Sequence, residues 1–159
     1  MHAAQKRFIE QHYRASEWYG RGMKGRRLIK DFRFEGSEVV EWALDRVQRD
    51  ERAKPSAIRS LWRHDESGAE LLAIDVFECA SLKAAHDQVM ETLGNIESGA
   101  VERRTGKNVI GDVTFGLGDT MVLFARANLV VLIRNAGRTV VRVVAIARAL
   151  DQSLLRQLE

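Results

Sequence analysis

The chain has 159 residues, a length that suits one domain, and its 45% hydrophobic content is typical of a globular protein. The formal charge is only +3 and the basic residues are mixed with acidic ones, so no nucleic-acid partner is expected. The single Cys excludes an intramolecular disulfide and a metal site built from Cys pairs, and no apolar run is long enough for a membrane span.

The first predicted element is a helix from Ala3 to about Tyr19, inside an N-terminal segment (1–23) that packs on the body of a single domain (1–159). Phe8 and His12 belong to an aromatic stripe with helical spacing, and charged residues occupy the opposite side. We interpret the histidine as a packed side chain rather than a metal ligand.

A glycine-rich basic loop follows at 20–30. Its glycines let backbone N–H groups approach an anion, and its basic side chains add positive charge. The spacing is not that of a phosphate-binding loop, so a solvated loop is favoured over an anion or partner site. The residues that such a site would use are Arg21, Lys24, Arg26, Arg27 and Lys30.

Residues 28–34 are predicted to form a strand. Ser37 then has the character of a helix N-cap, and apolar residues from Val39 onward at helical spacing predict a helix to about Glu51. The only Pro of the chain, Pro55, ends this helix.

Two strands at 57–64 and 70–79 are predicted to form a hairpin, because a turn-rich segment separates them. His64 and the two acidic residues after it belong to this turn, which is favoured over a metal site. Ser81 caps a helix over 82–96. A connector over 94–107 and a strand over 109–115 follow.

A hairpin is predicted within 120–137, with its turn at Ala127-Asn128. Both faces of both strands are largely apolar, whereas a sheet with one wet face alternates apolar and polar residues. Each face must therefore be covered, by a helix layer on one side and by the N-terminal segment, a second layer or a partner chain on the other. From Arg138 onward, apolar residues at intervals of three and four predict a final helix.

This order predicts an α+β fold with a mostly antiparallel sheet of six or seven strands and with N- and C-terminal helices. Residues 28–115 fit the β-α-β-β-α-β order of a ferredoxin-like unit. Asp31–Ser37 and Asp75–Ser81 each place a strand before a serine, which suggests a duplicated strand–helix unit.

From about Ala73 to Leu155 the chain resembles a class of poorly characterised bacterial exported domains. The segments that carry the resemblance are IDVFECASLKAAHDQVM, VIGDVTF, FARANLVVLI and VVAIARALDQSLL. The resemblance implies an exported, non-enzymatic α+β module and brings no catalytic residues. No signal peptide is visible, so a periplasmic or secreted location is expected if a leader has been removed, and a cytoplasmic one otherwise.

Catalytic, metal-ligand and cofactor motifs are not found, and Cys79 is expected to be buried rather than paired with His86. We therefore favour a non-catalytic binding or protein-interaction module that meets a protein partner or self-associates into a homo-oligomer. One alternative is a small-ligand-binding protein or enzyme with a sheet cavity. Another is an immunity-type or regulatory protein whose basic loop meets an acidic partner. The residues that the sheet cavity would use are Trp18, Trp42, Trp62, His64 and Arg126.

Overall fold

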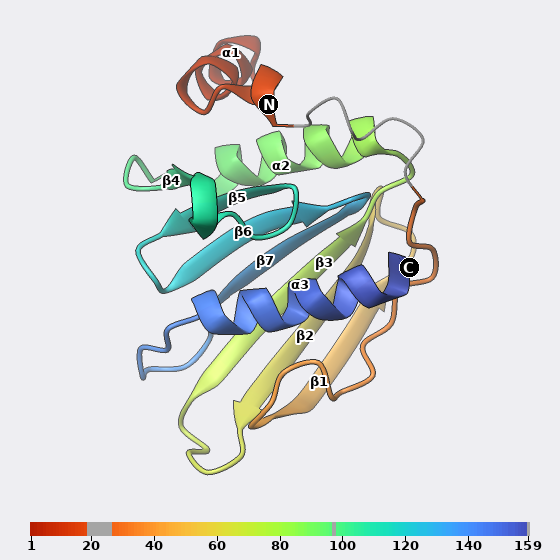
Figure 1. Ribbon diagram of the computed structural model, residues 1–159, viewed down its shortest axis with the longest axis vertical. Coiled ribbons are helices and arrows are strands. Elements are labelled where there is room, and N and C mark those ends of the chain that lie inside the picture. The colour runs from red at the N-terminus through yellow and green to blue at the C-terminus, as the bar shows by residue number, and fades with distance from the viewer. Residues whose placement is uncertain (19–26, 97, 159) are drawn as a thin grey trace.

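The computed structural model describes residues 1–18, 27–96 and 98–158, and within them one antiparallel sheet of seven strands runs in the order β1-β2-β3-β7-β6-β5-β4 (Figure 1). The strands are β1 (Trp42–Asp50), β2 (Ser56–His64), β3 (Leu71–Glu78), β4 (Glu102–Arg104), β5 (Val113–Leu117), β6 (Met121–Arg126) and β7 (Leu129–Asn135). The helices are α1 (Ala3–His12), α2 (Leu82–Ile96) and α3 (Val144–Leu158), and short 3-10 turns lie at Ala15–Glu17 and Gly106–Asn108.

The helices lie on both faces of the sheet. Figure 1 shows α3 crossing in front of the strands, whereas α2 lies between the sheet and α1. Alternate side chains of each central strand point to opposite faces, so the strands build two separate apolar cores. One core joins the sheet to α3, and the other joins it to α2, α1 and the 3-10 turn that follows α1.

The central hairpin is confirmed as β6 and β7, joined at Ala127-Asn128. Met121–Ala125 and Leu129–Ile133 are buried on both faces. The chain's own helices supply the cover, α3 on one face and α2 on the other. The hairpin therefore does not need a partner chain to exclude water.

The α+β class and the antiparallel sheet are confirmed, but the ferredoxin-like order is wrong. A ferredoxin-like unit places four strands around two crossover helices. Here β1, β2 and β3 form a continuous antiparallel meander, and β7 rather than an earlier strand lies next to β3. The first crossover helix of the predicted order does not exist, because its residues form β1.

Most of the segment 39–51 forms the strand β1 (Trp42–Asp50) instead of the predicted helix. An edge strand exposes polar residues on both faces, so its sequence lacks the alternation that identifies a half-buried strand. The bulge between Leu44 and Arg46 breaks the pattern further. Of the apolar residues that we read as one helical stripe, Val39 is buried, but Val40 and Val47 are 79% and 52% exposed.

Residues 28–34 belong to no strand, and Asp31 among them has a positive φ of 54°, so the predicted strand there and the duplicated unit at Asp31–Ser37 are both wrong. Hydrogen bonds from side chains hold this segment, instead of backbone hydrogen bonds to a neighbouring strand. The Phe32 N–H donates to the Glu78 carboxylate at 2.6 Å, and the Arg49 guanidinium donates to the Phe32 carbonyl at 2.5 Å.

The terminal helices differ from their predicted bounds. The α1 helix ends at His12, and its buried residue is Ile9, whereas Phe8 is 62% exposed, so the predicted stripe is displaced by one position. The α3 helix begins only at Val144, because the β-branched residues before it form an extended approach. The helix capped by Ser81 is confirmed, since its hydroxyl accepts the Ala84 N–H at 3.0 Å.

The side chain of Asn128 ties the hairpin turn to two distant segments. Its Oδ1 accepts the Ile29 N–H at 2.7 Å, and its Nδ2 donates to the carbonyls of Ile29 and Cys79, both at 2.8 Å. The residue is buried, with 1% of its surface exposed. The left-handed backbone of the turn lies at Ala127 (φ 53°), so the role of the asparagine is bonding rather than turn geometry.

We predict that Asn128→Ala lowers the free energy of unfolding by roughly 3 kcal/mol, because buried backbone groups of Ile29 and Cys79 lose their partner. Urea denaturation measures this change. Asn95→Ala, at an exposed position on α2, is the matched control and is expected to be nearly neutral. A loss in the Asn128 variant no larger than in the control would contradict the assigned role.

Candidate functional site

The structure does not gather the five predicted cavity residues into one cavity. Trp18 belongs to the core under α2, whereas Trp42 and Trp62 belong to the core under α3. Trp62 is fully buried, and its Nε1 donates to the Ser60 hydroxyl at 2.8 Å. Only Trp42 and His64 meet, with ring centroids 5.1 Å apart in an edge-to-face contact.

The fifth residue, Arg126, is the centre of a buried ion cluster. Its Nε and Nη2 donate to the two carboxylate oxygens of Asp151 on α3, at 2.7 and 2.8 Å, and its Nη1 lies 3.4 Å from Asp112. Burial alone would lower the pKa of Arg126, but the hydrogen bonds and charge of Asp151 and the charge of Asp112 raise it above its ordinary value. The three side chains are at most 11% exposed, so the cluster has no open side for a substrate.

Backbone N–H groups near the cluster bind its two carboxylates, and the backbone at Gly111 leaves no room for a side chain. The Gly111 N–H donates to Asp151 at 3.0 Å, and the Ala127 N–H donates to Asp112 at 2.7 Å. Gly111 has a φ of +68°, and a Cβ there would lie 2.3 Å from the Ala125 carbonyl oxygen. The cluster thus joins the hairpin turn, the segment before β5 and α3 into one unit.

Of the basic loop residues, Arg21, Lys24 and Arg26 lie outside the described residues, and Arg27 and Lys30 are exposed. Burial and the nearby charges of Glu78 and Asp87 raise the pKa of Cys79 to about 12, so its thiol is protonated at neutral pH. His86 contacts Trp18 and the Ala15 carbonyl.

In residues 1–18, 27–96 and 98–158, we find no group of three or more His, Cys, Asp or Glu placed to hold a metal ion. The same ranges contain no helix that is both long and apolar enough to cross a membrane.

The α2 face of the sheet is only half covered. On this face, Phe115, Leu123 and Val130 from β5, β6 and β7 are buried beneath α2, α1 and the 3-10 turn that follows α1. Beyond α2, the same face of β1 and β2 carries exposed or half-exposed side chains, and β3 carries a mixture of buried and half-exposed ones. The residues of this uncovered half, placed by strand register, are Arg46, Gln48, Arg59, Leu61, Arg63, Leu71, Ala73 and Asp75.

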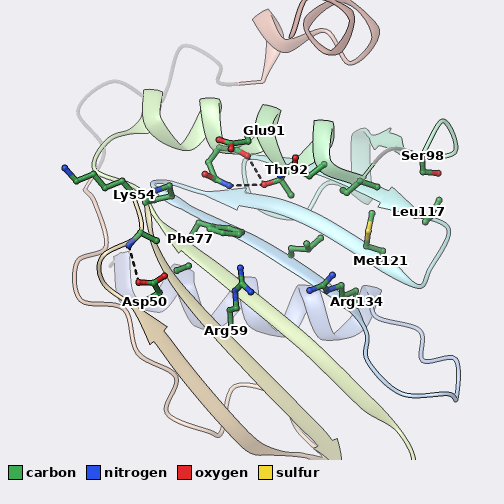
Figure 2. Close-up of a pocket in the computed structure, with 17 residues that line it drawn as sticks. Asp50, Lys54, Arg59, Phe77, Glu91, Thr92, Ser98, Leu117, Met121 and Arg134 are labelled. Carbon is green, nitrogen blue, oxygen red and sulfur yellow. Dashed lines mark hydrogen bonds between the residues drawn. The ribbon is translucent and has the colours of Figure 1, made fainter. Parts of the chain in front are cut away.

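A groove runs where α2 meets the uncovered half of the sheet, and its main section has a volume of 660 Å³. Figure 2 shows Arg59, Phe77 and Arg134 rising from the strands below α2, with Glu91 and Thr92 on the helix above them. A second section of 580 Å³ shares residues with the first and continues along α2. These volumes are in the range of ligand-binding clefts.

The groove has an apolar floor and polar walls. The floor is formed mainly by Ala57, Phe77, Leu117, Met121 and Leu132. The α2 wall presents the polar side chains of Gln88, Glu91, Thr92 and Asn95, and the β1–β2 turn closes one end with Asp50, Lys54 and Pro55.

Asp75 lies on the uncovered sheet beside the groove, between Arg59 on β2 and Leu132 on β7. It is 8% exposed, and its carboxylate lies 3.5 Å from Arg134 Nη2. Burial raises the pKa of Asp75 above its ordinary 3.8, although the charges of Arg134 and Arg59 act in the opposite direction. The side chain of Arg59 forms no hydrogen bond or ion pair within the described part of the chain, although its charge acts on Asp75.

Sequence reasoning missed the groove because its residues come from elements far apart in the chain. The one local signal is a charged residue inside an apolar strand, as Asp75 is within LLAIDVFE. Arg134 gives a similar signal at the end of an apolar strand. The strand order decides which charged residues share a face, and no local pattern indicates that β3 pairs with β7.

We predict that Asp151→Ala lowers the free energy of unfolding by about 3–5 kcal/mol, because it leaves the Arg126 guanidinium buried without its main partner. Guanidinium chloride denaturation measures the loss. Asp119→Ala, which removes an exposed carboxylate, is expected to change stability by less than about 0.5 kcal/mol. Equal effects of the two changes would contradict the role of the buried cluster.

The raised pKa of Asp75 predicts a specific pH dependence. The Asp75 carboxyl has a pKa of 3.8 in the unfolded chain and a higher pKa in the folded protein, so folding favours its protonated form. The contribution of Asp75 to stability is therefore present below pH 3.8 and is lost as pH rises through the raised pKa. The stability of Asp75→Asn relative to wild type should therefore increase with pH across that window. A relative stability that falls with pH would show that the two arginines outweigh burial.

No family model, curated protein or solved structure gives a significant match to this chain. The resemblance to bacterial exported domains stays a prediction.

Proposed function

We propose that the protein is a non-catalytic interaction module that holds an extended segment of a partner protein in the groove between α2 and the uncovered half of the sheet. The observation that carries this proposal is the asymmetric cover of the sheet. One face is covered by α3. On the other face, α1, the 3-10 turn that follows it and α2 cover β5, β6, β7 and the adjoining end of β3, and the rest of β1, β2 and β3 stays uncovered. The remaining half carries apolar side chains beside charged ones, a mixture that is typical of protein interfaces.

The shape of the groove favours an extended peptide over a compact molecule. Along α2, the two sections are lined from Ala84 to Ile96, a span of roughly 18 Å at the rise of an α-helix. An extended chain covers this distance with about five residues. The groove is open along its length, so a longer segment can enter and leave at both ends.

The polar side chains of the α2 wall suit a peptide backbone. The Gln88 amide donates to the Thr92 hydroxyl at 3.1 Å, and the other atoms of that amide remain able to bond a ligand. Asn95 is exposed one turn further on. Amide groups that both donate and accept can match the alternating N–H and C=O groups of an extended segment.

The chemistry of the described residues favours binding over catalysis. The buried polar side chains of Arg126, Asp112, Asp151 and Asn128 are bonded within the fold, and the thiol of Cys79 is protonated and buried. A binding groove needs none of these groups. A small ligand in the same groove is the second candidate, and the 660 Å³ volume favours it.

Self-association through β1 is a less favoured form of interaction. This edge strand has nine residues, and free edges can pair with another chain. A bulge and the charged residues Asp45, Arg46, Arg49 and Asp50 lie on it. Bulges and edge charges are the features by which natural sheets avoid such pairing.

A selection of random dodecapeptides displayed on phage tests the proposal. We predict that wild-type protein enriches peptides and that Gln88→Trp, which fills the groove from the α2 wall, reduces their binding at least about tenfold, a loss of 1.4 kcal/mol. Lys83→Trp, on the same helix but outside the groove, is the matched control and should bind as wild type does.

Enriched peptides that bind the Gln88→Trp variant as well as wild type would place the interaction elsewhere. A failure to enrich any sequence would reject the peptide-binding module itself.

A further inference from the structure

We infer that the segment bound in the groove is acidic, and that Arg59 and Arg134 bind its carboxylates. This inference rests on the proposed interaction function and specifies the chemistry of the partner. It follows from the charges on the sheet side of the groove, from which of them already have partners, and from the way the strand register spaces the two arginines.

The acidic residues on the sheet side are already engaged. Asp45 lies 3.4 Å from Arg63, and the Asp50 carboxylate accepts the N–H groups of Arg52 and Ala53 at 3.1 and 3.2 Å. Asp75 is the only carboxylate between Arg59 and Arg134 on this face of the sheet in the described chain.

One carboxylate cannot satisfy two guanidinium groups. Arg134 reaches Asp75 at 3.5 Å, a distance too long for a strong charge-assisted hydrogen bond. The side chain of Arg134 is 54% exposed, and Arg59 is exposed without a hydrogen-bond partner among the described residues. Each guanidinium therefore keeps donors free, in the planar arrangement that binds a carboxylate through two parallel bonds.

The register places the two arginines on either side of β3. Arg59 lies opposite Asp75, and Arg134 lies opposite Ala73, one step further along that strand face. Ala73 is small, so the Asp75 carboxylate is the only charged side chain of β3 between the two arginines. Their strands are about 10 Å apart. Acidic residues two positions apart in an extended segment are separated by about 7 Å, which flexible arginine side chains can reach.

The opposite wall makes the expected pattern more specific. Glu91 on α2 is exposed and lines both sections of the groove. It would repel a carboxylate that faced the helix. Since alternate residues of an extended segment point in opposite directions, the acidic residues should occupy every second position, facing the sheet, with neutral or basic residues between them.

Two synthetic peptides test the inference by titration into ¹⁵N-labelled protein. One is acetyl-Leu-Glu-Ser-Glu-Leu-amide, and the other has Gln in place of both Glu residues. We expect the Glu peptide to shift amide resonances of β2, β3 and α2, and to bind at least about fivefold more tightly than the Gln peptide at low salt. Because exposed charges are screened, the preference should shrink as NaCl is raised to about 0.5 M.

Matched variants assign the preference to the two arginines. Arg59→Gln, which leaves the Arg134–Asp75 pair intact, should lose part of the preference, and the Arg59→Gln, Arg134→Gln double variant should lose nearly all of it. Arg148→Gln removes an exposed guanidinium on α3, across the sheet, and should keep the full preference.

Three outcomes would overturn the inference, and they differ in whether the proposed interaction function survives. Equal binding of the two peptides at the groove would reject acidic specificity but keep the interaction module. A Glu preference that survives in the double variant would assign it to other residues. If neither peptide shifts groove resonances while a ten-nucleotide oligothymidine does, the anion bound is a nucleic acid and the proposed protein partner also fails.

Discussion

The structure depends most on the buried guanidinium of Arg126, which two aspartates hold from different parts of the chain. Asp151 brings in α3, and Asp112 brings in the segment before β5. The adjacent Asn128 joins the same turn to the N-terminal segment and to the end of β3. The side chains of Arg126 and Asn128, at the tip of the β6–β7 hairpin, thereby hold four other segments in place. The apolar faces of β6 and β7 then have a helix on each side.

This arrangement leaves open the part of the sheet where we propose that a partner binds. The helices α2 and α3 pack on opposite faces of the central strands, so the chain itself buries the apolar hairpin from water. The meander β1-β2-β3 extends the sheet past the reach of α2, and one of its faces stays open. The groove at that boundary combines an apolar floor with unpaired guanidinium donors of Arg59 and Arg134. An interaction site there leaves the core undisturbed.

Sequence reasoning was accurate where burial is complete and local. The strands β2, β3, β6 and β7 and the helix α2 were predicted because their apolar patterns are clear. It failed for β1, because an edge strand has no such alternation, and for residues 28–34, which long-range side-chain bonds hold. Gly111, Arg126 and Asp151 belong to three separate segments that the sequence analysis quoted, VIGDVTF, FARANLVVLI and VVAIARALDQSLL, but only the fold shows that they meet. The groove was missed because strand order decides which residues share a face.

We propose that ligands bind at the open half of the sheet while the rest of the fold stays closed. Hydrogen–deuterium exchange of the protein with and without a peptide selected by phage display tests it most directly. The account predicts that bound peptide slows exchange in β2, β3 and α2 and leaves α3 and the central hairpin unchanged. Slower exchange confined to α3 or α1, with none at the groove, would contradict it.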